Sequence, residues 1–252
     1  ENADSYEDTY PAIKKALSVC GGKHSMFMTK SESQDTTESY DEVLPTVSLD
    51  GDIAIIKLPD FLVTAEDFLG TAEAGQKYAK VAEDFIHENR DKIKGVVLDL
   101  RGNIGGDMGP MATAVSSLLP DGELVYYHYR SYDIPVTLKN GVVSNAGTGG
   151  RSLYPEEKLN VPVAILTDDM TASSGEALTL CFRGLENTRT FGAPTAGYTS
   201  VNMLYNMYDG AQMYLTVAFD KARTGEIFKE TPIEPDVATD SPLEAAIEWL
   251  RG

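Results

Sequence analysis

A serine that follows an apolar run could serve as a nucleophile in acyl-transfer chemistry. The segment 171–176 reads TASSGE, between a strand expected over 161–166 and a helix expected from about Ser173 to Arg183. A serine on a sharp strand-to-helix turn presents its hydroxyl to a cleft, and the N–H groups beside it can bind an oxyanion. The spacing of Ser173 and Glu176 is also typical of a helix capping box, and the local pattern alone favours capping.

A glycine-rich turn follows another expected buried strand, over 96–100. The segment 99–106 reads DLRGNIGG. Glycines permit backbone conformations that leave N–H groups pointing at a ligand, here just before the start of a helix. The turn matches neither the dinucleotide fingerprint nor the Walker loop, so no nucleotide cofactor is predicted. An ordinary tight turn is the alternative.

A serine nucleophile needs a base, and the chain has three histidines. His87 is expected on an amphipathic helix over 71–90, at the edge of its buried face. His128 is expected as a packed residue of a strand over 124–129. His24 follows two glycines and opens a short apolar run, so the backbone could project it into a cleft. A structural role is the alternative for each histidine.

The charge balance limits the partners. The 252 residues include 21 Lys and Arg against 39 Asp and Glu, a net charge of −18. Such a surface repels nucleic acids and anionic lipids and attracts cations, including basic peptides. The two cysteines form no disulfide framework, and no Cys or His spacing indicates zinc. We therefore predict no nucleic-acid partner, no metal and no cofactor, and membrane contact only through an anchor absent from this chain.

The elements expected around these residues alternate between strand and helix, which predicts an α/β fold with right-handed crossovers. A first helix is expected over 10–20, a hairpin over 47–56, and an exposed hairpin and loop over 131–160. The acidic stretch 30–42 is expected to be a mobile loop. Further elements are expected over 111–119, 188–192, 200–207, 212–219 and 245–250.

Four segments together resemble the serine peptidases of the tail-specific (C-terminal processing) and tricorn-core family. They are DLRGNIGG at 99–106, TASSGE at 171–176, GAPTAG at 192–197 and PIEPD at 232–236. The second is especially similar to the corresponding segment of nisin-resistance-type members. Four segments in the family's order are specific, whereas any one alone is not.

The departures from the family pattern indicate a branch. Tail-specific members place a lysine base just after the third segment, where this chain has Tyr198. The tricorn-like branch uses a histidine near the N-terminus, and His24 resembles it. About 75 residues separate His24 from Asp99, too few for a PDZ domain. The resemblance implies a ClpP/crotonase-like core with a mixed β-sheet and crossover helices over 31–252. A small N-terminal helical segment, 1–30, would carry the histidine.

The resemblance also implies roles for these residues. Ser173 would be the nucleophile and His24 the general base. Backbone N–H groups of Ser174 and of Gly105 or Gly106 would form the oxyanion hole. The expected activity is a serine peptidase acting on exposed or unstructured peptides, cationic ones included, at an extracytoplasmic or cell-surface location.

The sequence leaves alternatives open for the third catalytic residue and for the function of the chain. Tricorn-like relatives use a glutamate shortly before the closing Pro-Asp, which points to Glu230, and a solvated surface acid is an equal interpretation of that residue. A catalytically silent ligand-binding module of the same fold and a crotonase-like acyl-CoA enzyme are alternative functions.

Overall fold

A six-stranded sheet forms the centre of the computed structural model, which describes residues 3–38, 43–62 and 68–252. Its strand order is β14-β10-β9-β4-β3-β2, and all neighbours are parallel except β2 and β3. The strands are β2 (Thr46–Asp50), β3 (Ile53–Lys57), β4 (Gly95–Asp99), β9 (Val163–Thr167), β10 (Thr188–Gly192) and β14 (Val237–Ala238). The predicted α/β class, the 47–56 hairpin and both buried strands are confirmed.

The second sheet is antiparallel throughout, with the order β1-β12-β5-β6-β7-β8 and with β11 and β13 also paired to β12. Its long strand β12 (Gln212–Ala222) therefore connects most of the sheet. The other strands are β1 (Met26–Met28), β5 (Gly122–His128), β6 (Asp133–Lys139), β7 (Val142–Ser144), β8 (Gly150–Arg151), β11 (Ser200–Asn206) and β13 (Ile227–Phe228).

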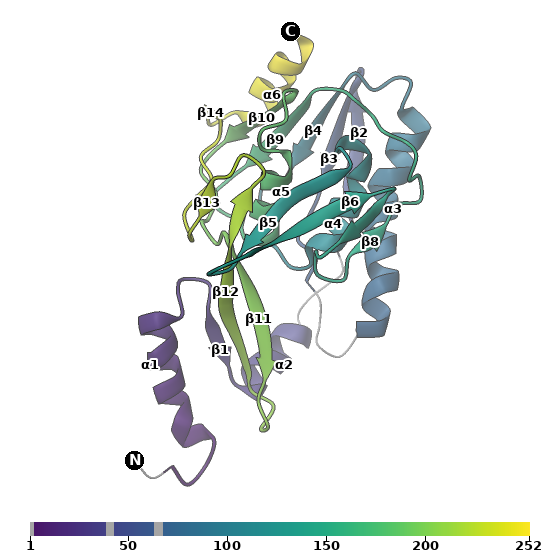
Figure 1. Ribbon diagram of the computed structural model, residues 1–252. Helices are drawn as coiled ribbons and strands as arrows, with labels where there is room; N and C mark the ends of the chain where they lie inside the picture. The colour runs from purple at the N-terminus through teal and green to yellow at the C-terminus, as the bar shows by residue number, and fades with distance from the viewer. Residues whose placement is uncertain (1–2, 39–42, 63–67) are drawn as a thin grey trace.

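Helices cover both faces of the central sheet (Figure 1). Side chains alternate along β4, so Val96 and Leu98 face the larger core while Val97 faces a smaller one. The smaller core is closed by α6, and the larger one includes α3, α4 and α5. The helices of the structure are α1 (Tyr10–Cys20), α2 (Lys30–Glu38), α3 (Phe68–Asn89), α4 (Met108–Ala114), α5 (Ser174–Phe182) and α6 (Pro242–Arg251), with short 3-10 turns η1 (Glu7–Thr9) and η2 (Ser116–Leu118).

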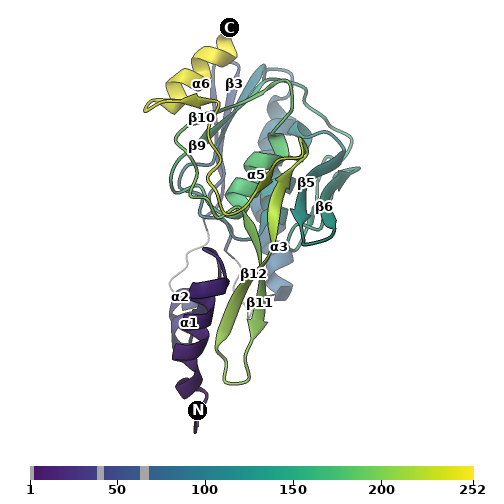
Figure 2. The same cartoon turned by 60° about the vertical axis from the view of Figure 1, so that its left-hand side comes forward.

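The N-terminal elements lie beside a projecting hairpin. Figures 1 and 2 show α1, β1 and α2 next to the far part of the β11–β12 hairpin, away from the main body. Antiparallel pairing of Met26–Met28 with β12 attaches this segment to the second sheet. The loop that carries His24 comes between α1 and β1.

The prediction of a mobile loop over 30–42 was wrong for residues 30–38, which form α2; residues 39–42 lie outside the described part. A reciprocal cap begins the helix: the Thr29 N–H donates to Glu32 Oε2 at 2.7 Å, and the Glu32 N–H donates to Thr29 Oγ1 at 3.3 Å. Ser33 then donates to Gln212 Oε1 of β12 at 2.8 Å. Acidic composition suggested a loop, but the capping pair starts a helix.

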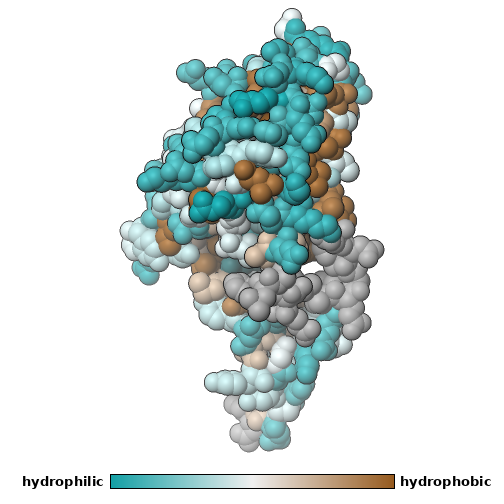
Figure 3. All heavy atoms as spheres, turned by 90° about the vertical axis from the view of Figure 1, so that its right-hand side faces the viewer, coloured by the Kyte–Doolittle hydropathy of each residue, from teal (hydrophilic) through white to brown (hydrophobic). Residues whose placement is uncertain are grey.

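The surface of the body matches the composition. On the face shown in Figure 3, hydrophilic side chains predominate and apolar ones form small groups. Among the described residues, no helix combines the length and apolar character needed to cross a bilayer.

Two neighbouring strands, β4 and β9, end in turns that pack on each other. Asn103, in the turn after β4, is fully buried, and its Oδ1 accepts from the Gly105 N–H at 2.9 Å. Its backbone carbonyl accepts from the Ala172 N–H at 2.9 Å. The Gly102 N–H donates to Asp168 Oδ1 at 3.0 Å. These bonds fix the glycine turn against the serine turn.

Gly106 provides a test of this packing. Its φ is +100°, and a Cβ there would lie 2.1 Å from the Phe61 carbonyl oxygen. Gly102 in the same turn has φ +76°, with open space around a Cβ. We expect Gly102→Ala to lower stability by about 1 kcal/mol through backbone strain. Gly106→Ala should cost about 1–3 kcal/mol more because of the clash. Equal thermal denaturation midpoints for the two variants would contradict this packing.

Candidate active site

Ser173 has a strained backbone at the start of α5. Its φ and ψ are 51° and −116°, a conformation that non-glycine residues rarely adopt. The described residues include four non-glycine residues with positive φ, and two of them are Ser173 and Glu230, both predicted site residues. The other two are asparagines, which tolerate this region better. Strain of this kind is held only where surrounding contacts enforce it, and it is frequent at functional sites.

The glycine turn lies directly against the serine. A Cβ on Gly105 would be 2.8 Å from the Ser173 Cβ and 3.1 Å from the Ser174 nitrogen. Only a glycine therefore permits this approach. The Ser174 hydroxyl donates to the Gly106 carbonyl at 2.6 Å, which adds a second link. The structure thus brings together Ser173, Ser174, Gly105 and Gly106, as the sequence predicted.

The backbone donors near Ser173 differ in availability. The Gly105 N–H is engaged by Asn103, as described above. The Phe61 N–H donates to the Gly105 carbonyl, and the Phe61 carbonyl accepts from the Asp107 N–H. The N–H and the carbonyl of Gly106 itself take no part in this bridge. Within the described ranges, the N–H groups of Gly106 and Ser174 donate to no protein acceptor.

The buried carboxylate of Glu176 binds the backbone of the serine turn. Its side chain accepts from the backbone N–H groups of Ser173 at 2.9 Å, Gly197 at 2.8 Å and Tyr198 at 2.7 Å. The Thr195 hydroxyl is a fourth donor. Glu176 is fully buried, so the carboxylate joins the serine turn to the segment 195–198. The sequence predicted that Glu176 would cap its helix or brace the turn, and it does both.

Burial sets the acidity around Glu176. Desolvation raises the pKa of Glu176 although four hydrogen bonds oppose that rise. Asp220 of β12 is buried nearby, and burial together with the Glu176 charge raises its pKa to about 8. A neutral Asp220 is the form that the folded chain favours below that pH.

His24 packs against the segment that Glu176 holds. The ring is partly buried, and its Nδ1 lies 3.0 Å from the Ser200 hydroxyl and 3.2 Å from the Ser200 carbonyl oxygen. The ring of Tyr198 meets the imidazole edge-on, with centroids 5.2 Å apart. The His24 carbonyl also accepts from the Asn202 side chain at 2.8 Å. Burial lowers the pKa of His24, an effect partly opposed by the Ser200 carbonyl and the Glu230 charge.

Glu230 holds the backbone of the histidine segment. Its carboxylate accepts from the Lys23 N–H at 2.7 Å and from the His24 N–H at 3.1 Å. The hydroxyls of Ser200 and Thr216 each lie 3.3 Å from Oε1. Partial burial would raise the pKa of Glu230, but these donors outweigh it and keep the pKa below its ordinary value. Glu230 therefore contacts the imidazole only indirectly, through Ser200.

The structure does not join His24 to Ser173 directly. No hydrogen bond connects the imidazole to the Ser173 hydroxyl in the described part of the chain. Both residues contact one segment instead: Tyr198 touches the His24 ring, and its N–H shares the Glu176 carboxylate with the Ser173 N–H. Tyr198 therefore links the two residues, through its ring on one side and its backbone N–H on the other.

The other histidines lie elsewhere. His87 stacks on Tyr154 with centroids 4.0 Å apart and contacts Glu157 at 2.9 Å. His128 of β5 is bonded to Asp133 at 2.6 Å. Both imidazoles are therefore bound to carboxylates, and neither contacts Ser173 within the described residues.

Ser200 was not predicted from the sequence. It comes three residues after the GAPTAG segment and begins β11, so only the pairing of β11 with β12 places it beside the N-terminal loop. A serine next to a strand start has no distinctive sequence signal. Its role depends on a contact across 176 positions of the chain.

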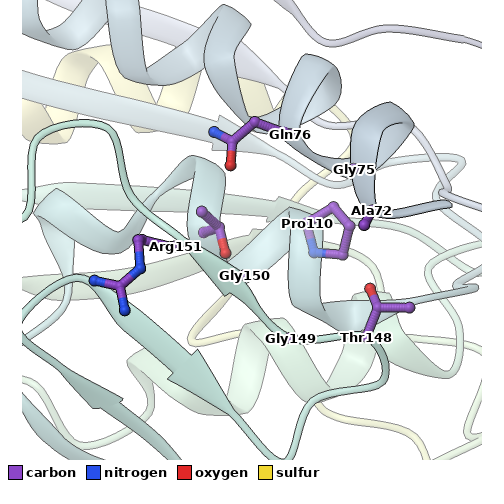
Figure 4. A pocket seen from close by; sticks show the side chains of 9 residues that line it. Ala72, Gly75, Gln76, Pro110, Thr148, Gly149, Gly150 and Arg151 are labelled. Atoms are coloured by element: carbon purple, nitrogen blue, oxygen red, sulfur yellow. The ribbon is translucent and has the colours of Figure 1, made fainter. Parts of the chain in front are cut away.

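One cavity lies apart from these residues. It has a volume of about 190 Å³ and is bordered by α3, α4 and the loop before β8 (Figure 4). Gln76, Pro110 and Arg151 are among its lining residues, and none of the predicted site residues is. Within the described residues, no group of three or more His, Cys, Asp or Glu side chains could hold a metal ion.

Comparisons with known proteins identify the family. The profile of Peptidase family S41 matches residues 52–239, which is most of the chain. The chain belongs to peptidase family S41. This confirms the resemblance to tail-specific and tricorn-type serine peptidases, and a peptide or protein is the substrate class of that family.

Individual relatives of this S41 chain extend the comparison. The nisin-resistance protein of Lactococcus lactis subsp. lactis is 38% identical over 251 residues, which are 99% of this chain and 76% of that protein. The solved structure of a lipoprotein from Streptococcus agalactiae matches with a TM-score of 0.83 and 30% identity, over 99% of this chain and 83% of that one.

A processing protease is a more distant relative. The carboxy-terminal processing protease CtpA of Bacillus subtilis (strain 168) is 29% identical over 173 residues, 68% of this S41 chain. The chain spans 34% of the length of that relative.

The Glu176 contacts generate a stability prediction. In Glu176→Gln, the side chain would have one acceptor oxygen instead of two. Its NH2 group would then face backbone N–H donors. We expect a loss of about 2–4 kcal/mol of unfolding free energy, measured by urea denaturation at pH 7. Glu234→Gln is the matched control, because Glu234 is exposed. A Glu176→Gln midpoint equal to that of the control would refute the bracing role.

Proposed function

We propose that this chain is a serine-type peptidase that hydrolyses exposed or unstructured peptides, with Ser173 as nucleophile and His24 as general base. One observation carries the proposal. The strained turn of Ser173 lies against Gly105, while two neighbouring backbone N–H groups, those of Gly106 and Ser174, donate to no acceptor among the residues that the structure describes. This geometry suits attack on a carbonyl whose oxygen becomes charged.

In the proposed reaction, the Ser173 oxygen attacks the peptide carbonyl carbon while its proton passes to Nε2 of His24, because Nδ1 is occupied by Ser200. The N–H groups of Gly106 and Ser174 donate to the oxyanion. The imidazolium then gives its proton to the leaving amine as the C–N bond breaks. A water molecule, deprotonated by the same imidazole, then attacks the acyl carbon. The ester bond to the Ser173 oxygen breaks, the imidazolium returns its proton to that oxygen, and the new carboxyl end of the peptide leaves.

Glu230 acts as a positioning residue in this proposal. It binds the backbone of the His24 segment and the Ser200 hydroxyl, which in turn contacts Nδ1. Catalysis requires the imidazole to move into hydrogen-bond contact with Ser173. Apo active sites often have looser contacts that tighten with substrate.

The finer predictions about architecture and context belong to the same proposal. We propose a ClpP/crotonase-like core over 31–252, with the segment 1–30 supplying the histidine. The net charge of −18 favours cationic peptides as substrates. The Streptococcus agalactiae relative is a lipoprotein, which supports an extracytoplasmic location.

The test is cleavage of an unstructured basic peptide together with labelling by a fluorophosphonate. Wild type and Ser18→Ala, a control on exposed α1, should cleave and be labelled, whereas Ser173→Ala should do neither. Loss of the nucleophile is expected to lower kcat by about 10⁴-fold or more. Equal cleavage by wild type and Ser173→Ala would overturn the proposal.

The absence of a hydrogen bond between His24 and Ser173 in the described part of the chain favours one other candidate, a catalytically silent binding module of the same fold. In that case wild type would neither cleave nor be labelled, although it would still bind a peptide. The same experiment therefore separates the two functions.

The pH dependence tests the base. A general base must be neutral, and burial lowers the pKa of His24 in the folded chain. The neutral form therefore persists to lower pH than in a free imidazole. Activity should fall on acidification with a midpoint below about 6.5. A midpoint at or above that value in the pH dependence of kcat/KM would contradict the assignment of His24.

A further inference from the structure

Lys23, which precedes the histidine, makes contacts that are unusual for a lysine in so acidic a chain. Its ammonium donates to the Ala196 carbonyl and lies 4.4 Å from the ring centroid of Tyr198. Its backbone N–H is held by Glu230 at 2.7 Å. Among the described residues, no carboxylate forms an ion pair with Lys23, although acidic residues outnumber basic ones by 39 to 21.

The Tyr198 ring lies between two groups of the N-terminal loop. The ammonium of Lys23 is over its face, and the imidazole of His24 meets it edge-on at 5.2 Å. A cation over an aromatic face is attracted by the π electrons, which fixes the orientation of the ring. Tyr198 is also fixed through its backbone, because its N–H donates to Glu176. The Tyr198 ring is therefore held in a fixed position against the imidazole.

We propose that Lys23 is a positioning residue for His24. Its ammonium fastens the histidine loop to the Ala196–Tyr198 turn, which Glu176 also ties to Ser173. The proposal rests on the proposed peptidase function for its catalytic consequence, but not for its effect on the ring.

The groups that face the imidazole define the electrostatic expectation. They are Lys23 from the same loop, Tyr198 and Ser200 from the 196–200 segment, and Glu230 from the loop between β13 and the PIEPD segment at 232–236. Glu230 raises the pKa of His24 and Lys23 lowers it, both less than burial does. Removing the ammonium leaves the carboxylate without its opposing charge, so the pKa of His24 should rise.

The experiment follows the His24 ring by NMR titration of the full chain, with His24→Gln used to assign its signal among the three histidines. In Lys23→Met we expect the His24 pKa to rise by about 0.5 unit, as one charge does across a water-like medium. Lys23→Arg keeps the charge and should leave the pKa at the wild-type value. Lys15→Met, on exposed α1, is the matched control and should also leave it unchanged.

Peptide cleavage provides the second readout. In Lys23→Met the acidic limb of activity should shift to higher pH with the ring pKa. At pH 8, where the imidazole is neutral in every variant, kcat should fall about threefold to fivefold through lost positioning. In Lys23→Arg, both the position of the acidic limb and kcat at pH 8 should stay at the wild-type values. A purely structural role would lower the unfolding temperature without moving the limb.

The outcomes distinguish this inference from the proposed function. An unchanged His24 pKa in Lys23→Met overturns the role of Lys23, whether or not the chain cleaves peptides. A shifted pKa in a chain that cleaves no peptide supports the charge effect and overturns the peptidase function. A shifted pKa with unchanged kcat at pH 8 overturns the positioning role.

Discussion

The buried carboxylate of Glu176 is the interaction on which the site depends. A carboxylate removed from water requires several donors, and here three backbone N–H groups and one hydroxyl supply them. The donors come from two places far apart in the sequence, the serine turn and the 195–198 segment. Satisfying one buried carboxylate therefore fixes the position of Ser173, the proposed nucleophile, relative to the segment that contacts His24.

The same bonds explain how Ser173 keeps a strained backbone. A positive φ at a serine costs free energy, and a local turn alone would relax it. Glu176 holds the Ser173 N–H from one side, while Gly105 presses against the Cβ from the other. Relaxation would leave a buried carboxylate with one donor fewer. Glu230, the other predicted site residue with a positive φ, is held likewise by the two N–H groups of the histidine loop.

Local pattern could predict the parts of the site that lie at strand ends. Buried strands 96–100 and 161–166 are continuous apolar runs, and neighbouring parallel strands bring their following turns together. The family resemblance implied that Gly105 and Gly106 lie beside Ser173, and the parallel pairing of β4 with β9 is the physical reason. Ser200, by contrast, depends on the pairing of β11 with β12 and of β12 with β1, which no short segment specifies. Helix α2 was missed because its acidic composition outweighed a capping pair, Thr29 and Glu32.

The two halves of the proposed dyad are held with different firmness. Ser173 belongs to the turn after a fully buried parallel strand, supported by a fully buried acid. His24 belongs to a loop between α1 and a three-residue strand, attached by a partly buried Glu230 and by the exposed Lys23. Motion that changes the distance between imidazole and hydroxyl is therefore expected in the histidine loop, since the serine turn cannot move without disrupting Glu176. In the proposed peptidase function, a substrate that contacts both the body and the N-terminal segment would bring the imidazole and the Ser173 hydroxyl into hydrogen-bond contact by moving the less firmly held histidine loop.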